Sequence, residues 1–225
     1  MTFADRLLTF LTTFPPPAAP LPAGVVAPDP YGTGPARHLL TAFANTFYAD
    51  DCPRVAVLGI NPGRFGGGTT GIAFTDPVAL ADSCGIGTDL PRRRELSSEF
   101  VYRFIDALGG PAAFYGQFYL GSVYPRVLLK DGLNHNYYDS APLLRALAPD
   151  LRAALRQQVA VGFRRDVVVS LGQRNAEFLR RLNDELGLFD RVVALDHPRF
   201  IMQYKRRQLA DYVAQYVATL GELVA

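Results

Sequence analysis

Cysteine, methionine and tryptophan are scarce in this 225-residue chain, which contains two cysteines, two methionines and no tryptophan. A zinc or iron–sulfur site built from four thiolates is excluded, because only Cys52 and Cys84 are present to contribute. We interpret both as structural or incidental thiols of a protein in a reducing compartment. The composition gives no reason to expect a metal, and we expect no other cofactor.

Long apolar runs are also missing. The longest have the length of a β-strand and are interrupted, so none predicts a membrane-spanning helix. The N-terminal segment carries Asp5 among periodic leucines, a pattern that favours an amphipathic helix over a signal peptide. We therefore expect a cytoplasmic protein without a membrane partner.

A strong excess of either charge is absent as well. The net charge is +2, with 49% hydrophobic and 20% charged residues, values that are ordinary for a soluble globular protein. This balance neither requires nor excludes nucleic acid as a partner. Positive charge is grouped at residues 92–94 and 205–207, and such short clusters, taken alone, are more typical of a solvated surface than of a phosphate site.

Four apolar segments of strand length alternate with helical patterns along the chain. This alternation favours βαβ units, and hence an α/β fold with a parallel sheet. We expect strands near residues 55–58, 117–124, 166–171 and 191–195. We expect helices near residues 3–11, 36–48, 77–81, 97–108, 141–162, 175–186 and 200–220, with Asp76 as the N-cap of the third and Ser97 or Ser98 as that of the fourth.

The segments between these elements carry turn and loop signals. Residues 14–35 are dense in proline and glycine, so we expect an extended surface wrap or a partly mobile linker that forms neither a helix nor a β-ladder. Residues 82–95 are predicted to be an exposed loop. Residues 126–140, rich in Asn, His and Tyr, are predicted to be a loop suited to binding a polar ligand. No composition break divides the chain, so residues 1–52 are expected to belong to the same domain as residues 53–225.

Glycine is concentrated directly after the first predicted strand, where GINPG occupies residues 59–63. Such a loop lets the backbone approach a ligand closely. Ligands bind at the carboxyl ends of the strands in parallel sheets, and His197 and Pro198 follow the last strand. Taken singly, Asn61 is typical of a turn residue and His197 of a structural histidine. Together they predict one cleft with both side chains on its rim.

The motifs GINPG at residues 59–63, TGIAF at residues 70–74 and HPR at residues 197–199 give the chain a family likeness. It resembles the uracil-DNA glycosylase superfamily, most closely the branch of the single-strand-selective monofunctional enzyme. The resemblance implies a three-layer α/β/α fold with a central four-stranded, mainly parallel sheet. It also implies a monofunctional enzyme that hydrolyses the N-glycosidic bond of uracil in DNA and leaves an abasic site.

The resemblance assigns roles to individual residues of these motifs. Asn61 would orient the attacking water, and His197 would donate a hydrogen bond to O2 of the departing uracil. The Phe74 ring would stack on the base, and backbone N–H groups near Ile60 and Phe74 would complete the polar contacts. The implied substrate-binding residues are Ile60, Gly63, Phe65, Gly71, Phe74 and Ser122.

A base inside a duplex has to be extruded before an enzyme can reach its glycosidic bond. In the family, the loop after the histidine supplies a wedge that fills the gap. Arg199 is the first candidate for this wedge, with Phe200 and Met202 as alternatives. The partner is then DNA, single- or double-stranded, bound by a monomer. Phosphate contacts are expected from the basic residues that follow within two helical turns, Lys205, Arg206 and Arg207.

One position departs from the family pattern. Relatives carry an asparagine near the end of the second strand, which reads uracil and rejects cytosine, whereas here that strand ends with Ser122 and no asparagine. A serine forms one hydrogen bond but no bidentate pair, and Asn134 or Asn136 in the following loop are candidates to substitute. Hydroxymethyluracil, xanthine and hypoxanthine therefore stay open as substrates beside uracil.

Two other functions are less consistent with these motifs. A dinucleotide-dependent enzyme is disfavoured because the glycines lack the G-x-G-x-x-G order that opens a helix. A non-catalytic nucleic-acid-binding protein with the same fold is the stronger alternative. It is disfavoured because a binder has no need of a water-positioning amide such as that of Asn61.

Overall fold

The computed structural model describes residues 1–224, and a four-stranded parallel sheet forms its centre. The strands lie in the order β3-β2-β6-β7, and each neighbouring pair is parallel. Every residue of β2 is buried, as its run of Val and Leu predicts. The predicted α/β fold is confirmed, with strands β2 (Arg54–Gly59), β3 (Phe118–Ser122), β6 (Phe163–Leu171) and β7 (Val192–Leu195).

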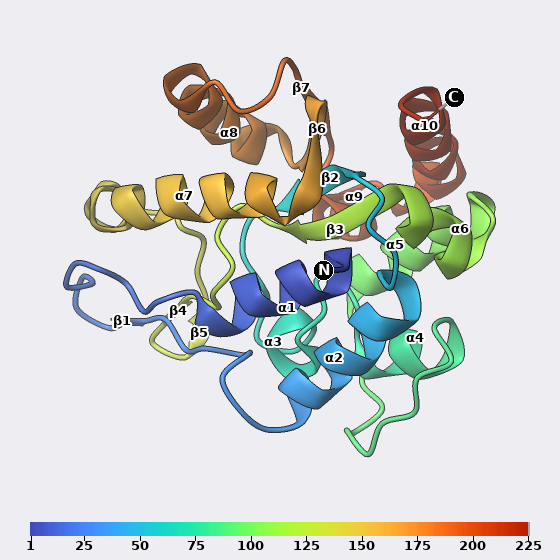
Figure 1. Ribbon diagram of the computed structural model, residues 1–225, viewed down its shortest axis with the longest axis horizontal. Helices are drawn as coiled ribbons and strands as arrows, with labels where there is room; N and C mark the ends of the chain where they lie inside the picture. Colours follow the sequence, from blue (N-terminus) through green and yellow to red (C-terminus); the bar gives the residue numbers. More distant parts are fainter. Residues whose placement is uncertain (225) are drawn as a thin grey trace.

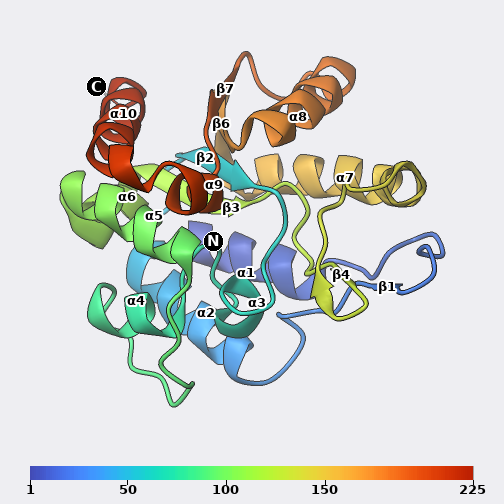
Figure 2. The ribbon, with the colours of Figure 1, turned by 180° about the vertical axis from the view of Figure 1, so that it is seen from behind.

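Helices cover both faces of this sheet (Figure 1). On one face, α1 (Phe3–Thr13) packs against α7 (Ala141–Gly162). On the other, α5 (Leu96–Ala107) packs against α9 (Pro198–Tyr204) and α10 (Leu209–Glu222), which lie in front of the sheet in Figure 2. The other helices are α2 (Pro35–Phe47), α3 (Gly67–Thr70), α4 (Pro77–Asp82), α6 (Gly110–Gln117), α8 (Gln173–Leu186) and the 3₁₀ turn η1 (Arg206–Gln208). Within residues 1–224, no helix combines the length and the hydropathy that a bilayer crossing requires.

Two of the predicted loop segments form a small sheet instead. Strand β1 (Val25–Val26) pairs with β4 (Leu129–Lys130), which pairs with β5 (Leu133–Asn134), all antiparallel. The prediction that residues 14–35 form no β-ladder was therefore wrong, as was the prediction of a plain loop at residues 126–140. A proline removes a donor only at its own position, so the two valines between prolines keep theirs and pair with a distant hairpin.

The helix boundaries near α5 and α6 also differ from expectation. Asp76 caps α4 as predicted, and its carboxylate accepts the N–H groups of Val78 and Ala79. Neither Ser97 nor Ser98 caps α5, whose N-cap is Glu95. Helix α6 was not predicted, because glycine and proline at residues 109–111 are more typical of the end of a helix than of its start. The glycines in fact turn the chain at positive φ, and the proline lies in the first turn of the new helix.

The predicted single helix over residues 200–220 was wrong. His197 caps α9, which begins at Pro198 and ends at Tyr204. Lys205 then has φ −122° and ψ 21°, and a 3₁₀ turn leads into α10. Neither glycine nor proline marks this break in the sequence. The packing of both helices against α5 accompanies it, and helical propensity yields to such tertiary contacts.

Candidate active site

A cleft of about 760 Å³ opens at the carboxyl ends of the central strands. The glycine-rich loop after β2, Ser122 at the end of β3 and His197 after β7 all contribute to its lining. Asn61 and Phe74 also line the cleft. Residues 136 positions apart (197 − 61) thus meet in one cavity, as their places after parallel strands predict.

The side-chain amide of Asn61 is held at both ends by a neighbouring backbone segment. Its Nδ2 donates to the carbonyl oxygen of His135 at 3.0 Å, and its Oδ1 accepts the N–H of Tyr137 at 3.3 Å. These bonds fix which end is nitrogen and which is oxygen. An amide has two N–H groups and two oxygen lone pairs, so one of each is left for a ligand.

The imidazole of His197 is fixed in one tautomer. Its Nδ1 accepts the backbone N–H of Arg199 at 3.1 Å, so the proton of the neutral ring lies on Nε2. Burial, and to a lesser extent the positive charge of Arg199, lower the pKa of His197 from 6.5 to about 4. At neutral pH the side chain is therefore a neutral hydrogen-bond donor that lines the cleft.

The Phe74 ring lies between the glycine loop and His197. Its centroid is 5.8 Å from that of the His197 ring, at an interplanar angle of 49°. A Cβ at Gly59 would lie 2.6 Å from Cε2 of Phe74, so only glycine allows the ring this position. The turn that contains Phe74 is closed by Thr70, whose hydroxyl donates to the carbonyl oxygen of Thr75 at 2.7 Å.

Arginines and exposed apolar side chains surround the cleft. The guanidinium carbons of Arg64 and Arg93 lie 4.4 and 3.6 Å from the centroid of the Phe65 ring. Arg94 and Arg199 also line the cleft. Glu95 is the one acidic residue among the lining side chains, and burial raises its pKa. Four of the large hydrophobic side chains that are exposed on the described chain line it too: Leu96, Leu133, Phe200 and Tyr204. This surface suits a polyanion that also carries apolar rings.

The hairpin of β4 and β5 lies beside the glycine-rich loop that follows β2 (Figures 1 and 2). The backbone N–H of Arg64 donates to Oδ1 of Asn134 at 3.0 Å, and its guanidinium donates to the carbonyl oxygen of Gly132. Asn134 and Asn136 both line the cleft. The amide of Asn136, however, is bonded to Asp139 at 3.1 Å. Each of the two candidates for reading a base thus has one end of its amide already bonded, Oδ1 in Asn134 and Nδ2 in Asn136.

The structure brings most of the sequence-predicted site residues into this cleft. Those that line it are Ile60, Asn61, Gly63, Phe65, Phe74, Ser122, His197, Arg199 and Phe200.

Five predicted residues lie elsewhere. Gly71 packs against α2, where a Cβ would lie 2.6 Å from the carbonyl oxygen of Ala36. Met202 is buried in the core, because it lies on the inner side of α9. The basic residues after α9, Lys205, Arg206 and Arg207, are not among the side chains that line the cleft. Arg206 pairs with Glu99 at 3.8 Å instead.

Sequence reasoning missed several cleft residues, namely Arg64, Glu95, Gln203 and Tyr204. For the last two a signal existed, because a helix that begins at Pro198 places positions 199, 200, 203 and 204 on one face. The side chains of Phe200 and Tyr204 are in fact neighbours, with ring centroids 5.5 Å apart. Arg93 and Arg94 were predicted only as part of a basic cluster, because no motif in the neighbouring sequence indicates that their loop lies at the cleft.

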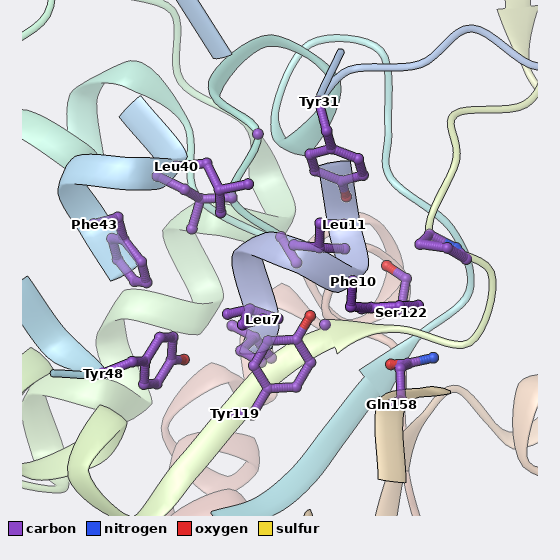
Figure 3. Close-up of a pocket in the computed structure, with 16 residues that line it drawn as sticks. Leu7, Phe10, Leu11, Tyr31, Leu40, Phe43, Tyr48, Tyr119, Ser122 and Gln158 are labelled. Atoms are coloured by element: carbon purple, nitrogen blue, oxygen red, sulfur yellow. The ribbon is translucent and has the colours of Figure 1, made fainter. Parts of the chain in front are cut away.

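A second, much smaller cavity lies inside the protein on the other side of Ser122 (Figure 3). It has a volume of about 20 Å³ and is lined by side chains of α1, α2 and β3 and by Gln158 of α7. Oε1 of Gln158 is buried without a hydrogen-bond partner. The volume is that of one water molecule, far too small for a nucleobase. Of these two cavities, only the large cleft has room for a nucleobase.

Neither the cysteines nor a cluster of ligands indicates metal or thiol chemistry in the described residues. Within residues 1–224, no three His, Cys, Asp or Glu side chains gather where they could hold a metal ion. Cys52 is exposed and Cys84 is buried, both as free thiols. Burial raises the pKa of Cys84 to about 11, so its thiol stays protonated at neutral pH and is a poor nucleophile.

The comparison with family models gives a match to the family described as the uracil DNA glycosylase superfamily, over residues 46–221. The chain belongs to this superfamily. The resemblance inferred from the three motifs is thereby confirmed. A comparison with curated proteins gives no match.

Among solved structures, this uracil-DNA glycosylase superfamily member is similar to wild-type SMUG2 from Pedobacter heparinus, in its crystal structure. The two are 39% identical, with a TM-score of 0.96, and the match covers 99% of this chain and 98% of that one. The similarity therefore includes α1 and the proline-rich segment, which carry no motif. Family membership and this match support a uracil-DNA glycosylase-type function that acts on DNA.

Proposed function

We propose that this glycosylase is monofunctional and excises uracil from DNA by hydrolysing the N-glycosidic bond, leaving an abasic site. The observation that carries the proposal is the meeting of the Asn61 amide and the neutral His197 donor in one cleft, with the Phe74 ring beside them. Uracil enters against Phe74, so that the glycosidic bond lies between the amide and the imidazole.

The two polar side chains serve opposite ends of the reaction. When the bond between C1′ and N1 breaks, its electron pair leaves with the base, and C1′ develops oxocarbenium character. His197 donates its Nε2 proton in a hydrogen bond to O2 of the uracil anion. Asn61 aligns the water that adds to C1′, and the proton that this water loses balances the one that the uracil anion finally takes up. An amide is a weak base, which suits a reaction in which bond breaking leads.

DNA binding in this proposal uses the rim of the cleft. Arg64, Arg93 and Arg199 face the phosphates, whose contacts position a nucleic acid without reading its sequence. Phe200 and Tyr204 are 41% and 72% exposed on one face of α9, so they can fill the space that an extruded nucleotide leaves. Arg199 and Phe200 remain wedge candidates, whereas the buried Met202 does not.

Incubation with uracil-containing oligonucleotides tests the proposal. Alkali cleaves DNA at abasic sites, so a uracil-dependent product from single- or double-stranded substrate is the expected result. Parallel substrates with hydroxymethyluracil, xanthine and hypoxanthine test what Ser122 and Asn134 accept at the base edge. No product from any substrate, together with a salt-dependent gel shift, would favour the non-catalytic binder.

The rate of excision is expected to stay level from about pH 8 down to about pH 5 and to fall as the pH approaches 4. The reason is the lowered pKa of His197, which keeps the ring neutral until then. Protonation puts a hydrogen on Nδ1 and breaks the bond from the N–H of Arg199. Single-turnover rates across this range, with binding saturated at each pH, measure the profile.

Glu95 is the control for this profile, because it lines the same cleft and its own pKa is raised by burial. An inflection in the plot of rate against pH that disappears in Glu95→Gln reports the titration of the Glu95 carboxyl group. A step near pH 6.5 that persists in Glu95→Gln contradicts the neutral donor assigned to His197.

A further inference from the structure

The bonds that orient the Asn61 amide come from backbone atoms of one short segment, residues 135–137. The carbonyl of His135 and the N–H of Tyr137 must therefore keep a fixed spacing for the amide to keep its direction. Whatever fixes the peptide units between these two residues also fixes Asn61.

Asp139 binds those peptide units directly. Its Oδ2 accepts the backbone N–H of Asn136 at 2.8 Å, and its Oδ1 accepts Nδ2 of Asn136 at 3.1 Å. The same Oδ2 lies 3.4 Å from Nδ1 of His135. The backbone N–H of Asp139 returns a bond to the carbonyl oxygen of Asn136 at 3.0 Å. The Asp139 carboxylate thus fixes Asn136. This residue lies between His135 and Tyr137, whose backbone groups are bonded to the Asn61 amide.

The core anchors the far side of the same segment. The Tyr137 hydroxyl donates to Oδ1 of the wholly buried Asn175 at 2.8 Å. Nδ2 of Asn175 donates to the carbonyl oxygen of Leu58 at 3.2 Å and to Oγ of Ser170 at 3.0 Å. Tyr137 is therefore tied to the end of β2, from which Asn61 extends. The side that faces away from the core depends on Asp139, whose side chain is 29% exposed.

We propose that Asp139 is a positioning residue for the attacking water, acting through the backbone of residues 135–137 on the Asn61 amide. The effect of Asp139 on catalysis rests on the proposed glycosylase function. The contact between Asp139 and residues 135–137 does not. Asp139 itself touches neither the base nor the sugar.

Asp139→Ala is expected to lower kcat by roughly 10- to 100-fold, because a small misplacement of a positioned reactant costs that much. The KM for the oligonucleotide and the melting temperature change little, since the side chain is partly exposed and is not among those that line the cleft. Asp139→Asn keeps an oxygen for the N–H of Asn136 and restores most of kcat. Asp184→Ala, which removes an exposed carboxylate from α8, is the charge-matched control and keeps the wild-type rate.

The coupling to Asn61 is tested by repeating Asp139→Ala in an Asn61→Ala background. If Asp139 acts through Asn61, the second change lowers the residual kcat no further. An equal loss in both backgrounds, or a wild-type kcat in Asp139→Ala, overturns the inference.

Amide NMR tests the same link without turnover. In Asp139→Ala, the Asn61 side-chain amide signals shift and the Tyr137 backbone N–H exchanges faster with solvent. Unchanged amide signals overturn the inference. A wild-type protein that excises no base overturns the proposed function instead, and the amide signals still decide whether Asp139 holds Asn61.

Discussion

His197→Ala is expected to lower the single-turnover rate of base excision by roughly 10²–10³. In the proposed mechanism, the variant removes the Nε2 donor to the departing base. It leaves the arginines that line the cleft unchanged. The Kd for uracil-containing DNA, measured by fluorescence anisotropy, therefore stays close to that of the wild type. The loss belongs to kcat, because charge develops on the base only as the bond breaks.

The His197 variant needs a structural control, since the same side chain caps α9 through Nδ1. Losing an N-cap costs about 1 kcal/mol of stability. His197→Asn keeps a capping oxygen but not the donor at the position of Nε2, so it separates the two effects. His38→Ala, on the exposed face of α2, keeps the wild-type rate. A His197→Asn protein with full activity would contradict the role of the Nε2 donor.

Asn61→Ala is expected to lower the rate of excision by at least about 100-fold, with little change in DNA affinity. The amide is bonded at both ends to the backbone of residues 135–137. In the proposed mechanism it can therefore align water without reorganising during the reaction. Alanine removes that alignment, and it also leaves the carbonyl of His135 and the N–H of Tyr137 without their partner. Single-turnover kinetics and anisotropy measure the two quantities.

Asn45→Ala is the matched control for this variant, because Asn45 is an exposed asparagine on α2, outside the cleft lining. It should match the wild type in rate and affinity. Asn61→Ala with a weakened Kd and an unchanged rate at saturation would mean that the amide binds DNA and takes no part in orienting water.

The central sheet was predictable because its signals are local. Each strand is a short apolar run, and the carboxyl ends of parallel strands fall on one edge of the sheet. The sequence alone therefore predicts that Asn61 and His197 lie close together, and both line the cleft. The small sheet was not predictable in this way. Its strands have two residues each, and β1 pairs with a hairpin about a hundred positions away.

The rim of the cleft was the other part that the sequence did not predict. Its side chains depend on where α9 begins and ends, and the break at Lys205 has no local signal. Arg64 and Arg93 meet on Phe65 only because two loops approach each other in space. The buried polar groups that hold Asn61 likewise come from residues 135–137, which carry no recognisable motif.

The contact between Gly59 and Phe74 couples the evolution of two distant positions. Phe74 has φ +55°, a conformation that costs a residue with a side chain about 1–3 kcal/mol, and its ring fills the space that a Cβ at position 59 would need. A lineage that gained a side chain at position 59 would have to give up the aromatic ring at position 74. Position 59 can therefore gain a side chain only in a protein that has lost the ring at position 74, and a library that varies position 59 alone samples mostly proteins in which the new side chain collides with Phe74.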